Sequence, residues 1–424
     1  MELTLNRYFN KGEVLNQLQS SNNIKSNHYT NSAAFYVDPI NNLHWINNLH
    51  WNQRFYLNLE KEVHPFNEPH LFRPLNRAYN GKTTFWSTPS PEPNLSDDFW
   101  NKVQESFKLN AKLSCKSLSE NYKADENCKI YSNEQEDGID KADEDYKIYS
   151  KEQDTGIYKA AQNLASLISH WQPNPEKIIF VSILRAGVPI TEWLCKMLPG
   201  SVGAALSFFV GIGIDKIALA KIESDFPDRS IIFVDGWTGK GGVAREISML
   251  NKGPLAVLID PWGWANFAGV KEDIFCPSAC FTGVATLGFS RTFFVDSDSL
   301  FSAYRFPKEF SQTQIIESWK RFAPQYKEIL KRSNNIKEYT NESGIMKFYV
   351  ETDLRIHSNE VCRAFINAAP ENLLFADDKF FAQKNFSLLL ELAEQRKIPA
   401  EFNVSHLKEL KTRVACKLLS KSSL

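Results

Sequence analysis

The sequence predicts an α/β fold built on a parallel sheet, for three reasons. Apolar runs of strand length recur between residues 157 and 300, and amphipathic helical stretches separate them. The runs are apolar throughout, which is typical of strands that helices bury on both faces. Two of the runs end in loops rich in glycine or charge, at the strand ends where parallel sheets hold their ligands. We therefore expect a sheet with helices on both faces.

The expected elements follow in chain order. A helix with Ala, Leu and Ile at helical spacing covers 157–171, and the strand IIFVSIL follows at Ile178–Leu184. The turn RAGVP then leads into the helix ITEWLCKML. The strand Ile231–Asp235, the loop WTGKGG and the helix VAREISML come next, followed by the strand Leu255–Asp260. Short apolar strands joined by such helices form βαβ units, so these strands should be parallel.

Length and composition divide the chain into regions, because 424 residues exceed one ordinary core. We expect five: an irregular N-terminal cover region at 1–110, an acidic insertion with a tandem duplication at 111–156, the main α/β domain at 157–300, a connector at 301–344 and a second small α/β unit at 345–424.

Composition also excludes some classes of protein. No apolar run is long enough to cross a bilayer, and the first residues lack the features of a secretory signal, so we expect no membrane partner and a cytoplasmic location. Seven irregularly spaced cysteines favour free thiols in a reducing compartment. Residues 301–424 carry 20 Lys and Arg against 15 Asp and Glu, which makes this part the expected place for a polyanion.

The loop after the strand Ile231–Asp235 has the composition of a phosphate cradle. Glycines let consecutive backbone N–H groups point inward, and the next helix adds the partial positive charge of its N-terminus. Asp235 is an acceptor suited to sugar hydroxyls, and a plain glycine-rich connector is the alternative. The residues expected to bind phosphate are Thr238, Gly239, Lys240, Gly241 and Gly242.

A second loop suited to anions, LRAG, follows the strand IIFVSIL. Small residues beside an arginine allow a backbone amide and a guanidinium to meet one polyphosphate. We expect Arg185, Ala186 and Gly187 to bind pyrophosphate; an arginine at a capped, solvated strand end is the alternative.

These two loops carry a resemblance. The strand followed by TGKGG resembles the phosphoribosyl-pyrophosphate loop of the phosphoribosyltransferases, and LRAG resembles their short pyrophosphate loop. The similarity covers about residues 157–295. It implies a phosphoribosyltransferase-like fold and a transferase of pentosyl groups that binds phosphoribosyl pyrophosphate or a related sugar phosphate with Mg²⁺.

The resemblance also implies residue roles. Asp235, Arg185 and Lys216 would be catalytic, and Asp235 would reach Mg²⁺ through water. Lys216 lies on a segment that corresponds to a mobile loop of these enzymes; a surface lysine is the alternative. On the substrate side the resemblance implies Asp260, Ser278 and Arg291.

The loop departs from the transferase pattern, because Asp235-Gly236-Trp237 leads directly into Thr238, with one acid and two spacer residues fewer than usual. This leaves open a non-catalytic, nucleotide-sensing, RNA-binding stress protein.

The stretches VDGWTGKG and PSAC are similar to a bacterial family often described as cysteine protease StiP. That family is associated with tellurite resistance and stress, with a nucleoside-like metabolite as a proposed product. Cys276 and Cys280 lie four residues apart, and the closest histidines in the sequence are His170 and His357. A cysteine protease needs a thiolate, a base and an orienting group. Neither cysteine has a nucleophile signature around it. We therefore expect both to be small buried residues in the last strands of the sheet, and we do not expect a protease.

The C-terminal segment His357–Asp378, continued by LLLELAEQRKIPAEF, resembles the Pelota and kink-turn-binding proteins. This implies a small C-terminal α/β sandwich of Pelota-like type and RNA as a partner. Asn359, Glu360 and Arg363 stand at the matching contact positions, where such side chains reach unpaired bases and the backbone. The alternative is an Asn helix cap with Glu in the first turn. Strands are expected at 346–351 and 372–377, and the sequence also allows a homodimer.

Overall fold

The computed structural model describes residues 51–62, 156–209, 213–282, 287–290, 292, 299–306, 319–320, 323–326, 354–367, 370–395 and 397–418. The duplicated acidic insertion, the strand expected at 346–351 and the substrate-side Arg291 therefore lie outside the described residues.

A parallel sheet of six strands forms the centre of the protein, in the order β1-β4-β3-β7-β8-β9. Every neighbouring pair in it is parallel, as the continuous apolar runs predicted. Its strands are β1 (Gln53–Tyr56), β3 (Ile178–Ile183), β4 (Val202–Leu206), β7 (Ser230–Trp237), β8 (Leu255–Ile259) and β9 (Phe267–Val270).

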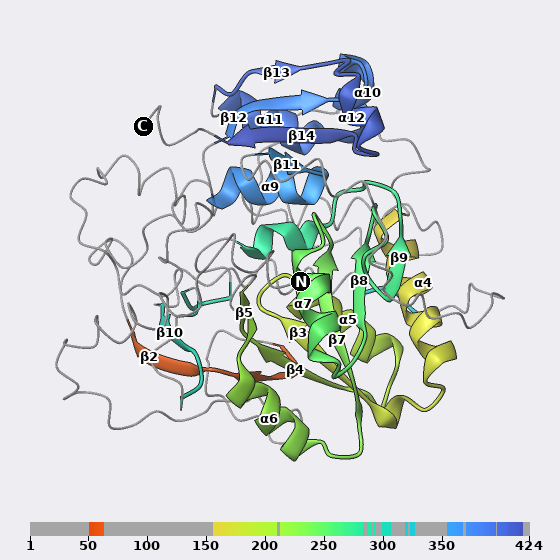
Figure 1. Ribbon diagram of the computed structural model, residues 1–424, viewed down its shortest axis with the longest axis vertical. Helices are drawn as coiled ribbons and strands as arrows, with labels where there is room; N and C mark the ends of the chain where they lie inside the picture. Colours follow the sequence, from red (N-terminus) through yellow and green to blue (C-terminus); the bar gives the residue numbers. More distant parts are fainter. Residues whose placement is uncertain are drawn as a thin grey trace, which may run out of the picture.

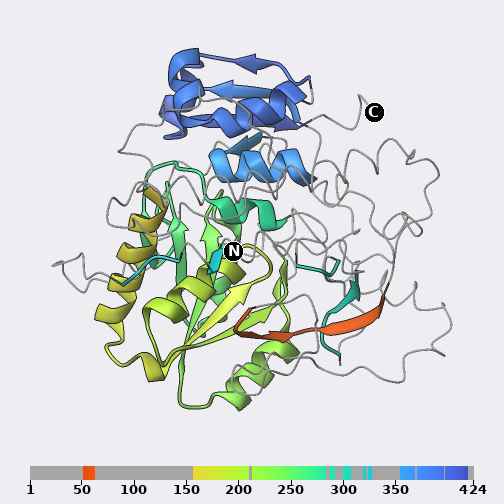
Figure 2. The same ribbon diagram turned by 180° about the vertical axis from the view of Figure 1, so that it is seen from behind.

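Helices cover both faces of this sheet (Figure 1, Figure 2). Helices α4 (Gly156–Trp171) and α5 (Gly187–Met197) pack on one face, against residues such as Phe180. Helices α6 (Lys216–Asp225) and α7 (Gly242–Leu250) pack on the other, against residues such as Phe233. Because helices bury both faces of the sheet, its strands do not alternate between apolar and polar residues. None of the described helices is long and apolar enough to span a membrane.

Strand β1 comes from the region interpreted as an irregular cover, where no strand was expected. Its Gln53 is fully buried and donates from Nε2 to the Val188 carbonyl at 2.7 Å. Gln53 Oε1 accepts from the Ser182 hydroxyl at 2.7 Å. A buried amide is tolerated because both of its ends have partners. The shorter elements are β2 (Asn58–Glu62), paired with β10 (Ser302–Arg305), the hairpin β5 (Phe208–Phe209) and β6 (Gly213–Ile214), and the 3₁₀ helices η3 (Pro175–Lys177) and η4 (Pro277–Thr282).

Residues 354–418 form a separate α/β unit, called the C-terminal unit below, which is blue in Figure 1. Its four strands have the order β11-β14-β12-β13. The strand expected at 372–377 is β12, which begins two residues earlier. The elements are β11 (Leu354–Ile356), α9 (Ser358–Asn367), β12 (Pro370–Phe375), α10 (Lys379–Asn385), α11 (Ser387–Gln395), β13 (Ala400–Glu401), α12 (His406–Glu409) and β14 (Val414–Leu418).

Candidate active site at the loop end of the sheet

The loops that follow β3 and β7 lie side by side, as expected for neighbouring parallel strands. A Cβ on Gly187 would lie 2.1 Å from the carbonyl oxygen of Val234, so only glycine allows this approach of the two backbones. A Cβ on Gly236 would lie 3.7 Å from the Cβ of Ala186. Arg185, in the first loop, is 8% exposed, and its Nη1 donates to the Phe289 carbonyl at 3.4 Å.

Thr238 and Asp260 brace the loop after β7. The Thr238 hydroxyl donates to Asp260, and the Thr238 backbone N–H donates to the Ile259 carbonyl at 3.0 Å. Asp260 is fully buried and also accepts from the N–H groups of Gly263 at 2.9 Å and Ala265 at 2.7 Å. The Thr238 hydroxyl was expected to bind phosphate, but in this arrangement it donates a hydrogen bond that stabilises the loop. Asp260, expected on the substrate side, is a buried brace.

The C-terminal unit covers this loop end, with α9 lying across η4 (Figure 1, Figure 2). Asn359, which is fully buried, donates from Nδ2 to the Ile274 carbonyl at 2.9 Å. Its Oδ1 accepts the N–H of Cys276 at 2.6 Å. The contacts between α9 and residues 273–276 are called the junction below. Apolar residues of both units belong to one continuous buried cluster, so the junction is a packed interface.

Glu360 of α9 reaches into the loop after β7. Its Oε1 accepts the indole N–H of Trp237 at 2.9 Å and lies 3.5 Å from Arg363 Nη1. A Cβ on Gly239 would lie only 2.8 Å from Cγ of Glu360. Burial alone would raise the pKa of Glu360, but the charges of Arg363 and Arg355 and the indole hydrogen bond hold it below its ordinary value. Glu360 is therefore a carboxylate at neutral pH.

Asp235 titrates in the neutral range. Burial raises its pKa to about 7, the nearby charge of Glu360 adds to this, and the Gly236 N–H and Arg363 oppose it. The Gly236 N–H donates to Asp235 Oδ1 at 2.8 Å. A carboxyl group of this kind can take up or release a proton at neutral pH.

Asp273 anchors the C-terminal unit. Its Oδ1 accepts from the backbone N–H and the hydroxyl of Ser358, both at 2.8 Å, and its Oδ2 accepts the Arg413 N–H at 3.3 Å. Although burial opposes it, the neighbouring His357 and the Ser358 donors lower the pKa of Asp273.

His357 lies beside this carboxylate. Nδ1 of His357 is 3.7 Å from Asp273 Oδ2, and the Trp262 ring meets the imidazole edge-on at 5.4 Å between centroids. The side chain is 1% exposed, and within the described structure neither ring nitrogen has a hydrogen-bond partner. Its backbone φ of +68° is strained for a residue other than glycine.

Cys276 lies at the junction, where its backbone N–H donates to Asn359 Oδ1. Its side chain is fully buried, and Sγ is 3.1 Å from the Ser278 hydroxyl. Both side chains line Gly236, because a Cβ there would lie 3.7 Å from Cys276 Sγ and 2.5 Å from Ser278 Oγ. Cys276 is buried as expected, but it precedes η4 and is not in a strand. The Cys280 side chain lies outside the described residues.

Other predicted site residues are placed differently from the expectation. Lys216 is the exposed first residue of α6, which Asp215 caps through the Ile217 and Ala218 N–H groups, so it is not on a loop. Asn359, Glu360 and Arg363, expected to contact RNA, are engaged at or beside the junction. Sequence reasoning missed Asp273 and gave His357 no role, since neither stands in a motif.

The expected Mg²⁺ stays a prediction, since Asp235 was expected to hold it through water and Mg²⁺ needs few protein ligands. No cluster of three or more His, Cys, Asp or Glu able to hold a metal ion occurs among the described residues. Both Asp260 oxygens already accept protein donors, which leaves Asp235 alone. No step below uses a metal ion.

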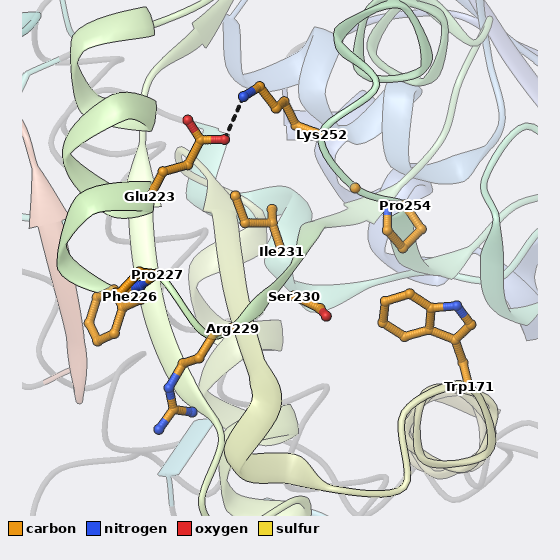
Figure 3. Close-up of a pocket in the computed structure, with 10 residues that line it drawn as sticks. Trp171, Glu223, Phe226, Pro227, Arg229, Ser230, Ile231, Lys252 and Pro254 are labelled. Atoms are coloured by element: carbon orange, nitrogen blue, oxygen red, sulfur yellow. Dashed lines mark ion pairs between the residues drawn. The ribbon is translucent and has the colours of Figure 1, made fainter.

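A recess of about 400 Å³ lies at the opposite end of the sheet (Figure 3). It is lined by residues that include Trp171 and Phe226, and Lys252 pairs with Glu223 across it at 2.7 Å. Arg229 donates to two backbone carbonyls at 2.9 Å each. Because its cations already have partners, we assign this recess no chemistry.

Comparison with known proteins finds similarity to one family over part of the chain. Residues 116–319 match the family described as "Tellurite-like stress resistance cysteine protease StiP". "Cysteine protease StiP" of Acinetobacter baylyi is 35% identical over 116 residues, which are 24% of this chain and 30% of that relative. The match thus spans less than a third of the relative's length. No solved structure matches this chain.

These names correct the functional expectation. A phosphoribosyltransferase was expected from the loops WTGKGG and LRAG, but the family and the relative are both named cysteine proteases. The alternative expectation was a non-catalytic, nucleotide-sensing, RNA-binding stress protein. It is not a protease either, so the same two names contradict it. The expected resemblance to the StiP family is supported by this match, and the description of that family names tellurite-like stress resistance.

Proposed function

Because residues 116–319 match the StiP family, we propose that this protein is a thiol-dependent peptidase with Cys276 as its nucleophile. One observation supports the proposal: Asp273 and Cys276 both bond to α9 at the junction, and Nδ1 of His357, the residue before α9, is 3.7 Å from Asp273 Oδ2, although 81 residues separate the cysteine from the histidine in the sequence. A nucleophile, a base and an orienting carboxylate are the parts that a cysteine peptidase needs.

Each residue has a role in this proposal. The Ser278 hydroxyl, 3.1 Å from Sγ, is placed to donate to a Cys276 thiolate. His357 accepts the thiol proton and later protonates the leaving amine, since imidazole exchanges protons near neutral pH. Asp273 orients the ring and stabilises its charged form. The thiolate attacks the peptide carbonyl to give a thioester, which water then hydrolyses.

Full burial of Cys276 sets a condition on this mechanism. No peptide carbonyl reaches Sγ while α9 is docked over η4, since the side chain is 0% exposed. The peptidase therefore requires α9 to move away from the sheet, and the same movement must bring His357 within hydrogen-bond reach of the thiol. The docked arrangement described above is the resting form.

Hydrolysis of an unstructured protein such as casein by the full chain tests the proposal, with Cys276→Ser beside Cys195→Ser as a matched control. Burial raises the pKa of Cys195 to about 12, so its thiol stays protonated and should not act as a nucleophile. We expect Cys276→Ser to lower kcat/KM by about a thousandfold or more, and the control to stay within about twofold.

Three results would overturn the assignment. One is hydrolysis that survives in Cys276→Ser, and another is hydrolysis lost in Cys280→Ser while Cys276→Ser retains it. The third is a wild-type chain without thiol-dependent cleavage. His357→Gln should lower kcat more than KM, and a variant with an unchanged pH profile would remove His357 from the mechanism.

We also propose the finer folds that the sequence suggested: a phosphoribosyltransferase-like sheet used for another reaction, and a Pelota-like, RNA-binding C-terminal unit. The adjacent loops after β3 and β7 support the first. The four-stranded sheet with α9 beside it supports the second. Filter binding of kink-turn and single-stranded RNA to the full chain tests the RNA partner, and no binding at low salt would refute it.

A further inference from the structure

The loop after β7 already holds an anionic group, and that group belongs to the protein. Glu360 arrives from α9, 121 residues after Gly239, and places its carboxylate against the loop. The Trp237 indole donates to Oε1 at 2.9 Å. Arg363 and Arg355 help to keep Glu360 ionised. The position of this ionised carboxylate indicates which kind of group the loop can bind.

The hydrogen-bond donor to Glu360 and the glycine that it packs against belong to the sheet domain. The Trp237 indole stays in place when α9 moves, because Trp237 is the last residue of β7 and is 6% exposed. Gly239 has no side chain, and a Cβ there would lie only 2.8 Å from Cγ of Glu360. Helix α7 begins directly after Gly241, whose φ is +79°, so the loop leads into the positive end of a helix dipole. Arg363 lies on α9 and leaves with Glu360.

We propose that the loop Trp237–Gly242 is a carboxylate-binding subsite, which Glu360 fills in the resting form and which an acidic side chain of a peptide substrate fills in its place. The substrate class rests on the proposed peptidase function, whereas the binding itself does not. The Glu360 side chain is 20% exposed, so the subsite is open to solvent at its edge. Acidic peptides are therefore the expected substrates.

The shape of the contact favours a carboxylate over a phosphate. Glu360 lays its Cγ against Gly239 and directs one oxygen to the indole N–H. A phosphate has three or more acceptor oxygens and needs several donors. The Thr238 hydroxyl, a further donor in this loop, is already committed to Asp260.

Calorimetry on the full chain, in the Cys276→Ser background, measures binding without cleavage. The probes are an N-acetylated, C-amidated tetrapeptide with one Glu among Ala residues, its Gln counterpart, and inorganic phosphate. Glu360→Ala empties the subsite, and Glu371→Ala is the matched control, because Glu371 is 49% exposed and pairs only loosely with Lys417 at 4.0 Å. Glu360→Gln keeps the shape of the side chain and guards against a misfolded Ala variant.

Removal of the internal competitor should tighten the binding of the Glu peptide. We expect about tenfold tighter binding to Glu360→Ala than to the parent, and no change with Glu371→Ala. Glu360→Gln should give an intermediate affinity. Trp237→Phe, added to Glu360→Ala, should lose about tenfold, because it removes a hydrogen bond to a charged group. Trp171→Phe, at the opposite end of the sheet, is the control for an indole and should bind as its parent does.

Two outcomes would overturn the subsite. Equal affinity for the Glu and Gln peptides in Glu360→Ala would mean that the loop does not select a carboxylate. Tighter binding of inorganic phosphate than of the Glu peptide, lost in Trp237→Phe, would mean that the loop is a phosphate site. Because no cleavage is measured, a failure of the peptidase proposal would leave these results unaffected.

Discussion

Replacement of Asp273 by Ala should release the C-terminal unit from the sheet. The change removes two hydrogen bonds of 2.8 Å from Ser358, a weaker one of 3.3 Å from the Arg413 N–H, and the His357 contact. A hydrogen bond to a charged group contributes about 1.5–3 kcal/mol, and loss of one partner from a buried ionic set costs about 3–5 kcal/mol. The contributions are not additive, so we expect the free energy of unfolding of the C-terminal unit to fall by about 4 kcal/mol.

Urea unfolding, together with hydrogen exchange at the Ser358 and Arg413 amides, measures this effect. Asp377→Ala is the matched control, since it removes an acid that pairs with Arg413 at 3.5 Å on the surface. Surface pairs contribute about 0–1 kcal/mol. If Asp273→Ala costs no more than the control, or if the two amides exchange no faster, Asp273 does not anchor the unit.

The anchor should also be sensitive to acid. The folded pKa of Asp273 is lowered from the ordinary value of 3.8, so its contribution is present above that value and is lost as the pH falls through the folded pKa. Wild type should therefore lose stability in acid more steeply than Asp273→Ala. Parallel pH profiles of the two proteins would contradict this assignment.

Three further substitutions test the fold and the site. Asp235→Asn should raise the free energy of unfolding at pH 8 by up to about 4 kcal/mol and leave it unchanged below pH 3. The pKa of Asp235 is about 7 in the folded protein and 3.8 ordinarily, so ionisation of this carboxyl destabilises the folded state as the pH rises from 3.8 to 7. A pH series of urea titrations would show this. Gly187→Ala should destabilise by about 3 kcal/mol or more in thermal unfolding, because its Cβ would lie 2.1 Å from the Val234 oxygen. Trp193→Phe should cost about 1–3 kcal/mol in the same assay, since its indole N–H donates to the Trp319 carbonyl at 2.6 Å.

The central sheet could be predicted because its signal is local. Strand β8 is apolar at every position and β3 at every position except Ser182, and burial on both faces favours that pattern. Strand β1 escaped prediction because it has four residues and includes Gln53 and Arg54. Its buried amide is satisfied by Val188 and Ser182, which lie more than a hundred residues away in the sequence.

Only the part of the site that is formed by residues close together in the sequence could be predicted. The loops after β3 and β7 stand out because they follow strand ends. The junction does not, because Cys276 and Asn359 are 83 residues apart and their contact depends on how two units dock. An Asn at the start of a helix has the same sequence pattern whether it caps the helix, binds RNA or, as here, bonds to a backbone amide of another unit.

The position of Asn359 constrains any RNA-binding role of α9. Its amide is committed at both ends within the junction, to the Cys276 N–H and to the Ile274 carbonyl, and the side chain is 0% exposed. A base edge read by this amide would have to replace both hydrogen bonds, and the same displacement would uncover Cys276. RNA contact through Asn359 and docking of α9 on the sheet therefore exclude each other. A chain that binds RNA through this residue must do so with its thiol exposed.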